Sequence, residues 1–173
     1  MATKKGIILT VGILGAITAA SFLFWLVPQT TQTVFFVSDY ESNLNGIVEI
    51  HETIITEIDE EFQNMLNEIT SPDEYKEIAE ISSSQLKSEI IHLIGSNPPE
   101  DWNQSYFNYL ESLKKSNTYI RETVVVANMI ENNDDGEKIQ ELIEKIEELK
   151  KDSKSLAMTS SELRPWFELI PFT

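Results

Sequence analysis

The chain contains no cysteine, only six glycines and six prolines, and more than twice as many acidic residues as basic ones. The lack of cysteine excludes disulfides, thiolate metal sites and thiol nucleophiles. The scarcity of glycine leaves little backbone that could cradle a phosphate group, and no nucleotide-binding glycine loop occurs. No serine, histidine and acid arrangement typical of hydrolases stands out either. We therefore predict that the protein is not an enzyme and holds no cofactor.

Basic residues are few and unevenly distributed. Lys4 and Lys5 precede the first apolar segment, so the rest of the chain carries 11 basic and 29 acidic residues, a net charge of −18. Such a surface repels phosphate backbones, because their neutralisation needs clustered Lys and Arg. We expect no nucleic-acid partner, whereas basic partners, cations or a purely solubilising role of the charge stay open.

The one long apolar run lies at the N-terminus, where 22 residues from Gly6 to Val27 carry no charge. As a helix this segment would be about 33 Å long, close to the hydrocarbon thickness of about 30 Å. Lysines flank it on the N-terminal side, and the first charge beyond it is Asp39. The positive-inside bias predicts a single-pass protein of the cell membrane. Its parts are a cytoplasmic N-terminus (1–5), a transmembrane anchor (6–27), a linker (28–33) and an extracytoplasmic remainder.

Two other interpretations of this segment involve cleavage. A signal peptide could be cut after Ala20, but the mature chain would then begin with an unburied apolar stretch at residues 22–27. A pilin-like leader could be cut after Gly6, but Val11 then stands where bacterial pilins carry a glutamate. An uncleaved anchor fits the residues better.

Small residues recur every four positions within the run, at Gly12, Ala16 and Ala20. This spacing lets a second membrane helix approach closely. Small residues are also common in any membrane helix, so the spacing is equally compatible with an unpartnered anchor. It marks a candidate packing face for a partner in the bilayer.

Beyond Pro28 the apolar residues recur at spacings of three and four, which is the helical period, and no segment is typical of a strand. We predict an all-α fold in which an up-down antiparallel bundle with coiled-coil-like packing covers residues 34–158. The first helix is expected from about Val34 to Ile69. Its stripe consists of Leu44, Val48, His51, Ile55, Ile58, Phe62, Met65 and Ile69, with Ile47 and Ile54 widening it.

Three later helix starts are predicted from capping chemistry. Ser71, Asn97 and Asp134 each stand three residues before a glutamate, the spacing at which cap and glutamate satisfy each other's backbone amides. The helix that follows Ser71 is expected to stop at Gly95.

The C-terminal tail, residues 159–173, contains a strongly apolar stretch at 165–172 with Trp166 and Phe167. We hypothesise that it meets the apolar residues 34–37 near the membrane, or sits among the lipid headgroups. The alternative is that the tail closes the base of the bundle.

The candidate metal ligands are His51, Glu89 and His92. Glu89 and His92 are three apart and share a helix face, as in di-metal carboxylate bundles. In an antiparallel hairpin His51 falls level with His92, and Glu52 and Asp101 could add carboxylates. A second glutamate–histidine motif is missing, however, so a polar core layer is the simpler interpretation and we predict no metal site.

Two blocks, KKGIILTVGILGAITAASFLFWLVPQ and SNPPEDWNQSYFNYLESLKKSNTYIRETVVVANMI, resemble uncharacterised single-pass helical membrane proteins of ammonia-oxidising archaea. This resemblance implies an archaeal cell envelope and an accessory role beside a membrane enzyme such as ammonia monooxygenase; it implies no catalytic residue. The expected function is an interaction or scaffold module whose partners are the bilayer and another protein or a second copy. A ligand-sensing ectodomain and an accessory subunit of a membrane enzyme complex are the alternatives.

Overall fold

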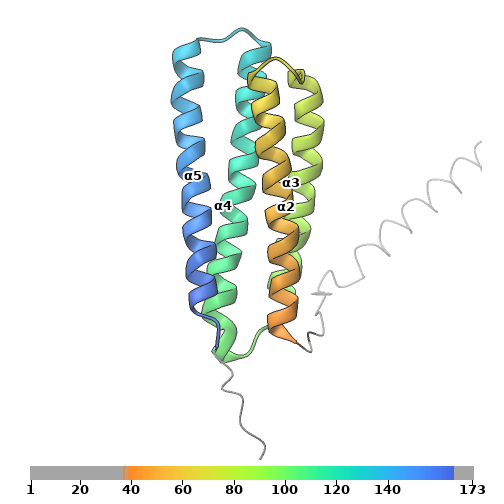
Figure 1. The fold of residues 1–173 in the computed structure, drawn as a ribbon, viewed down its shortest axis with the longest axis vertical. Helices are drawn as coiled ribbons and strands as arrows, with labels where there is room; N and C mark the ends of the chain where they lie inside the picture. The colour runs from red at the N-terminus through yellow and green to blue at the C-terminus, as the bar shows by residue number, and fades with distance from the viewer. Residues whose placement is uncertain (1–36, 38, 166–173) are drawn as a thin grey trace, which may run out of the picture. The chain divides into compact units, whose positions relative to one another are not determined.

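The computed structural model describes residue 37 and residues 39–165, and every element in this part of the chain is an α-helix. The helices are α2 (Tyr40–Leu66), α3 (Pro72–Gly95), α4 (Glu100–Glu131) and α5 (Gly136–Glu162). Successive helices run in opposite directions and are joined by short loops, so they form an up-down bundle (Figure 1). The prediction of an all-helical bundle is confirmed for the described residues.

Capping side chains fix where three of the helices begin, namely α2, α3 and α5. Asp39 accepts a hydrogen bond from the Ser42 amide at 3.0 Å, so α2 begins at Tyr40 rather than near Val34 as we expected. Ser71 forms the predicted capping box, in which the Glu74 amide donates to Ser71 Oγ and the Ser71 amide donates to Glu74 Oε2. These bonds satisfy first-turn amides that have no partner within the helix.

The other two predicted caps are wrong in position. The cap residue of α4 is Pro99, without a side-chain bond, and Asn97 has a left-handed backbone (φ 45°) that ends α3. Asn133 does the same after α4 (φ 54°), which shifts the start of α5 to a cap at Asp135. Asn97 therefore ends α3 instead of starting the next helix, and Asp135, not the predicted Asp134, caps α5. Asparagine suits both helix ends because it tolerates the left-handed region.

The ends of the helices also differ from the expected ones. α2 stops at Leu66, and Glu68 adopts a left-handed conformation (φ 61°) that turns the chain away. Ile69, expected at the end of the apolar stripe, is therefore 73% exposed. At the other end of the domain α5 continues to Glu162, past residue 158 where we expected the bundle to end.

Helix α4 is the centre of the bundle, since it packs against α2, α3 and α5. On α3 the apolar residues Tyr75 and Leu86 are buried, and on α4 Leu113 is buried. On α2 the residues Ile47 and Ile54 are buried, whereas Val48 and Ile55 are only partly covered. Val48 and Ile55 therefore face a less crowded side of the bundle.

None of the four helices described here combines the length and the apolar character needed to cross a membrane. The predicted anchor (6–27), its candidate packing face Gly12, Ala16 and Ala20, and the apolar stretch 166–172 lie outside the described residues.

Candidate functional site: a groove between α2 and α5

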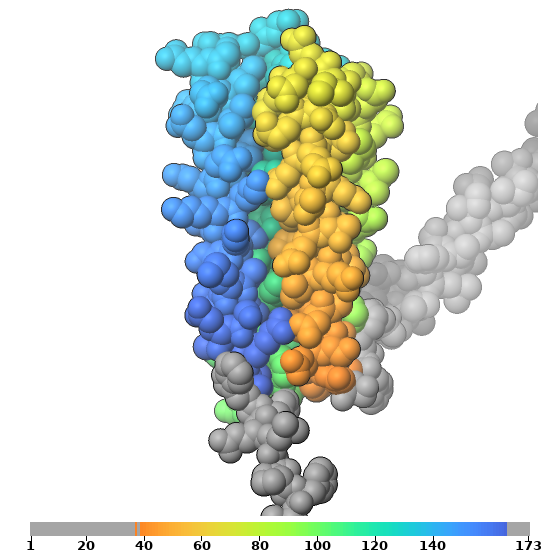
Figure 2. Space-filling view, in the orientation of Figure 1, coloured from red at the N-terminus to blue at the C-terminus, as the bar shows by residue number. Residues whose placement is uncertain are grey.

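A groove runs between α2 and α5, whose backbones do not come into contact within the described residues although α2 and α5 both pack on α4. Figure 2 shows the furrow, with α4 (teal) visible between α5 (blue) and α2 (orange). A polar bridge crosses each end. Arg164 Nη1 donates to Asn45 Oδ1 at 2.6 Å, and Lys150 Nζ lies 2.7 Å from Asp59 Oδ2. The two bridges are 14 residues apart along α2, from Asn45 to Asp59, so the open stretch is about 21 Å long.

The walls of this groove are mainly apolar, and its charged groups are mainly basic. Its volume is about 560 Å³. Val48 and Ile55 of α2 and Ala157 and Met158 of α5 line it, and Met158 is 58% exposed. The charged lining residues are Glu52, Lys150, Lys154 and Arg164. Lys150 is already paired with Asp59, so the excess positive charge comes from Lys154 and Arg164, and it favours an occupant with a carboxylate or another anionic group.

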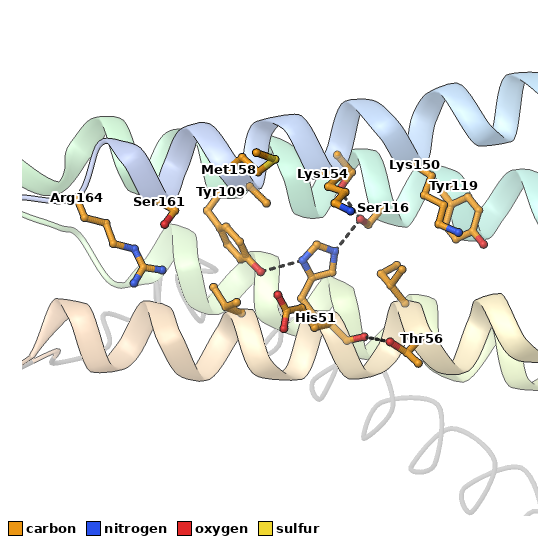
Figure 3. Close-up of a pocket in the computed structure, with 15 residues that line it drawn as sticks. His51, Thr56, Tyr109, Ser116, Tyr119, Lys150, Lys154, Met158, Ser161 and Arg164 are labelled. Atoms are coloured by element: carbon orange, nitrogen blue, oxygen red, sulfur yellow. Dashed lines mark hydrogen bonds between the residues drawn. The ribbon is translucent and has the colours of Figure 1, made fainter.

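His51 lies on the floor of the groove and points from α2 toward α4 (Figure 3). Its Nδ1 is 2.9 Å from Tyr109 Oη, and its Nε2 is 2.7 Å from Ser116 Oγ. The imidazole also meets the Tyr109 ring edge to face, with centroids 5.7 Å apart. Burial lowers the pKa of His51 to about 4, so the ring is neutral at neutral pH. A neutral ring donates through one nitrogen and accepts through the other, which both hydroxyl partners can accommodate.

The hydroxyl of Ser116, which contacts His51, also forms a hydrogen bond in the interface between α4 and α5. Ser116 Oγ is 2.7 Å from Ser153 Oγ, and Ser153 Oγ is 2.9 Å from Ser112 Oγ. A nucleophilic serine would need an acid on the far nitrogen of the histidine, where Tyr109 stands here. Ser116 is moreover only 3% exposed. The hydrogen bonds that join Tyr109, His51, Ser116 and Ser153 therefore hold the side chains on the floor of the groove in place.

Two reciprocal serine pairs hold α4 and α5 together. Ser112 and Ser153 each donate to the other's backbone carbonyl, at 2.8 and 3.0 Å. Ser105 and Ser160 repeat this geometry one heptad away, with both bonds at 2.8 Å. A side chain as short as serine reaches the opposite carbonyl only when the two helices approach closely. We call these two pairs the serine seam.

The serine seam was not predicted from the sequence, because the helix faces were predicted from apolar residues alone. A signal was present in the seven-residue spacing of Ser105 and Ser112 on one helix and of Ser153 and Ser160 on the other. All of these side chains are buried. Small residues in such a repeat indicate a close helix contact, although serine is ordinarily a surface residue.

At the upper end of the groove Asp59 accepts two bonds. Tyr119 Oη donates to its Oδ1, and the Lys150 ammonium lies beside its Oδ2. Burial, together with the neighbouring Asp59 carboxylate, raises the pKa of Tyr119 above its usual value, so the phenol remains a donor. This bridge therefore connects all three helices that form the groove.

At the lower end the bridge leaves one polar atom without a partner. Arg164 Nε is buried and has no hydrogen-bond partner among the described residues. A buried guanidinium N–H of this kind costs free energy unless an acceptor reaches it. The atom lies where α5 has ended and the chain leaves the helix.

The structure separates the three candidate metal ligands. His51 faces Tyr109 and Ser116 in the α2–α5 groove, whereas Glu89 lines a different groove between α2 and α3. Glu89 and His92 are adjacent as their spacing predicted, with Oε2 and Nδ1 3.8 Å apart. Of the other two candidates, Glu52 lines the His51 groove and Asp101 is exposed. No cluster of three or more histidine and carboxylate ligands occurs within residues 39–165.

Comparison of the chain with protein-family models, with curated proteins and with solved structures finds no match.

Proposed function

We propose that the protein is a membrane-anchored interaction or scaffold module that presents its helical bundle outside the cell membrane and binds a partner segment in the α2–α5 groove. The observation that carries the proposal is the groove itself, which two polar bridges close at its ends and which is otherwise open over about 21 Å. The proposal assigns no catalytic reaction to the chain.

The lining defines the chemistry of the partner segment. Apolar side chains would cover Val48, Ile55 and Met158, whose partial exposure leaves apolar surface to bury. A carboxylate would meet Lys154, which has no ion-pair partner among the described residues. An extended segment of about six or seven residues, at about 3.3 Å each, fills the length between the bridges. We therefore expect a short apolar peptide segment that carries at least one acidic residue.

The membrane placement belongs to the same proposal. The support for it is the uncharged run Gly6–Val27 with Lys4 and Lys5 on its N-terminal flank. Gly12, Ala16 and Ala20 would give the anchor its own contact face for a partner or a second copy. Coiled-coil-like packing of the bundle is supported by the seven-residue repeat of the serine seam.

A specific observation also favours the ligand-sensing alternative. The groove volume of about 560 Å³ falls in the range of small-molecule sites, and Ser161 and Lys154, which both line the groove, would supply the few polar contacts such sites need. The accessory-subunit alternative uses the same groove, with a subunit of the enzyme complex as the partner. It is the role that the resemblance to archaeal membrane proteins implies.

Photocrosslinking in native membranes tests the proposal. A photoreactive residue replaces Met158 in the groove or, as the matched control, Ile81 on α3, which is 62% exposed and is not part of the groove lining. We expect an adduct with one defined polypeptide from position 158, lost when Lys154→Glu reverses the charge beside it, and no such adduct from position 81. Equal adducts from both positions, or none from position 158, would contradict the proposal.

A further inference from the structure

We propose that the chain's own segment Trp166–Phe172 is the resting occupant of the α2–α5 groove, so that an external partner must displace it. The inference rests on the proposed function, because it names the first ligand of the same site.

The composition of the segment matches the lining. Residues 166–172 read WFELIPF, with five large apolar side chains and one carboxylate, Glu168. The groove offers apolar walls with basic side chains among them, including Lys154. Burial of the aromatic side chains against Val48 and Met158 would remove apolar surface of both partners from water.

The length also matches. The segment begins two residues after Arg164, which itself forms the lower bridge. Seven extended residues span about 23 Å at about 3.3 Å each, and the two bridges are about 21 Å apart. Pro165 stands where the chain would reverse, and proline is typical of turns. A segment that runs back along the groove brings Glu168 within reach of the long Lys154 side chain.

The buried Arg164 Nε is an independent indication. It is a hydrogen-bond donor without a partner among the described residues, at the end of the groove where the segment would enter. A backbone carbonyl of the returning segment would supply the acceptor that this group needs. The same groove thus shows apolar, ionic and hydrogen-bonding complementarity to one stretch of the chain.

Because the chain has no cysteine, the test can use engineered cysteine pairs in the full-length protein without background reaction. Ile170→Cys is combined with Thr56→Cys, which lies in the groove, or with Gln85→Cys, an exposed residue in the groove between α2 and α3. In detergent micelles under mild oxidation we expect an intramolecular disulfide to form about tenfold faster with position 56, because a docked segment raises the effective concentration of its thiol there. Lys154→Glu should slow the reaction of the first pair and leave the second unchanged.

Each other outcome overturns the inference. Equal rates for the two pairs would mean that the segment does not occupy the groove. A disulfide between two chains, detected when singly substituted proteins are mixed, would assign the segment to the groove of a second copy. Circular dichroism confirms that each variant remains helical.

Removal of the segment separates this inference from the proposed function. If the segment covers the groove, truncation after Pro165 increases the yield of the adduct at position 158. If the cysteine pair reacts as expected but the truncated chain captures no partner, the proposed function fails and the inference stands. If the adduct at position 158 forms while the cysteine pairs react equally, only the inference fails.

Discussion

Helix α5 has two very different sides. Toward α4 it approaches closely enough for serine hydroxyls to bond the opposite backbone, and those serines are completely or almost completely buried. Toward α2 only two polar bridges are made, by Lys150 of α5 and by Arg164 just beyond its end, and a groove is left between them. The contrast shows how one helix can serve both stability and recognition, because small buried residues close one interface and partly exposed apolar residues leave the other open.

The largest effect is expected from Ser112→Leu in the serine seam. The larger side chain cannot fit between closely packed helices, and the Ser153 backbone carbonyl loses the hydroxyl that donates to it, so we expect about 4 kcal/mol of destabilisation from overpacking and the lost bond together. Chemical denaturation of the full-length protein measures it. The matched control is Ser161→Leu on the groove side of α5, where the same change should cost less than about 1 kcal/mol. Similar losses for both variants would refute the asymmetry of α5.

The next largest effect is a pH dependence at His51, where the groove meets the seam. The folded state holds the pKa of His51 at about 4, below the value of 6.5 for the unfolded chain. The unfolded state therefore binds the proton first. The stability that depends on the neutral ring is fully present above pH 6.5 and is lost as the pH falls to about 4, by up to about 3 kcal/mol.

We would measure the free energy of unfolding of the wild-type protein and of His51→Gln between pH 7.5 and pH 4. Comparison of the two proteins separates the contribution of His51 from that of the many carboxylates, which both proteins share. The difference between the two proteins should shrink as the pH falls. If the His51→Gln and wild-type curves stay parallel, the ring does not titrate as its burial requires.

A smaller effect is expected at the two bridges of the groove. Asp59→Ala leaves the buried Tyr119 hydroxyl without its acceptor, which should cost about 1–2 kcal/mol. Asn45→Ala removes an exposed partner of Arg164 and should cost less than about 0.5 kcal/mol. Thermal or chemical unfolding ranks the two. The reverse order would mean that the lower bridge holds α2 and α5 together.

The apolar period of the sequence was sufficient to predict an all-helical bundle, since burial of Leu44, Ile58 and Phe62 follows directly from spacings of three and four. The site was not predictable in the same way. Binary patterning treats serine as a surface residue, so Ser112 and Ser153 gave no core signal. Capping was ambiguous where asparagine stands between two helices, because Asn97 can start one helix or end another.

The groove illustrates a second limit of pattern analysis. Val48 and Ile55 belong to the apolar stripe of α2, yet they face the side where α5 makes no backbone contact. Apolar periodicity predicts which face of a helix is apolar. It does not distinguish an apolar face that is buried in the core from one that lines an open groove. That distinction depends on how far apart the neighbouring helices lie.

An even number of antiparallel helices brings the start of α2 and the end of α5 to the same pole of the bundle (Figure 1). Tension applied between these two ends would peel the helices apart from one pole instead of sliding them past each other. The Asn45–Arg164 bond would carry the load first, and the Asp59–Lys150 pair would follow. The domain would yield to force in steps, and its first step would widen the groove.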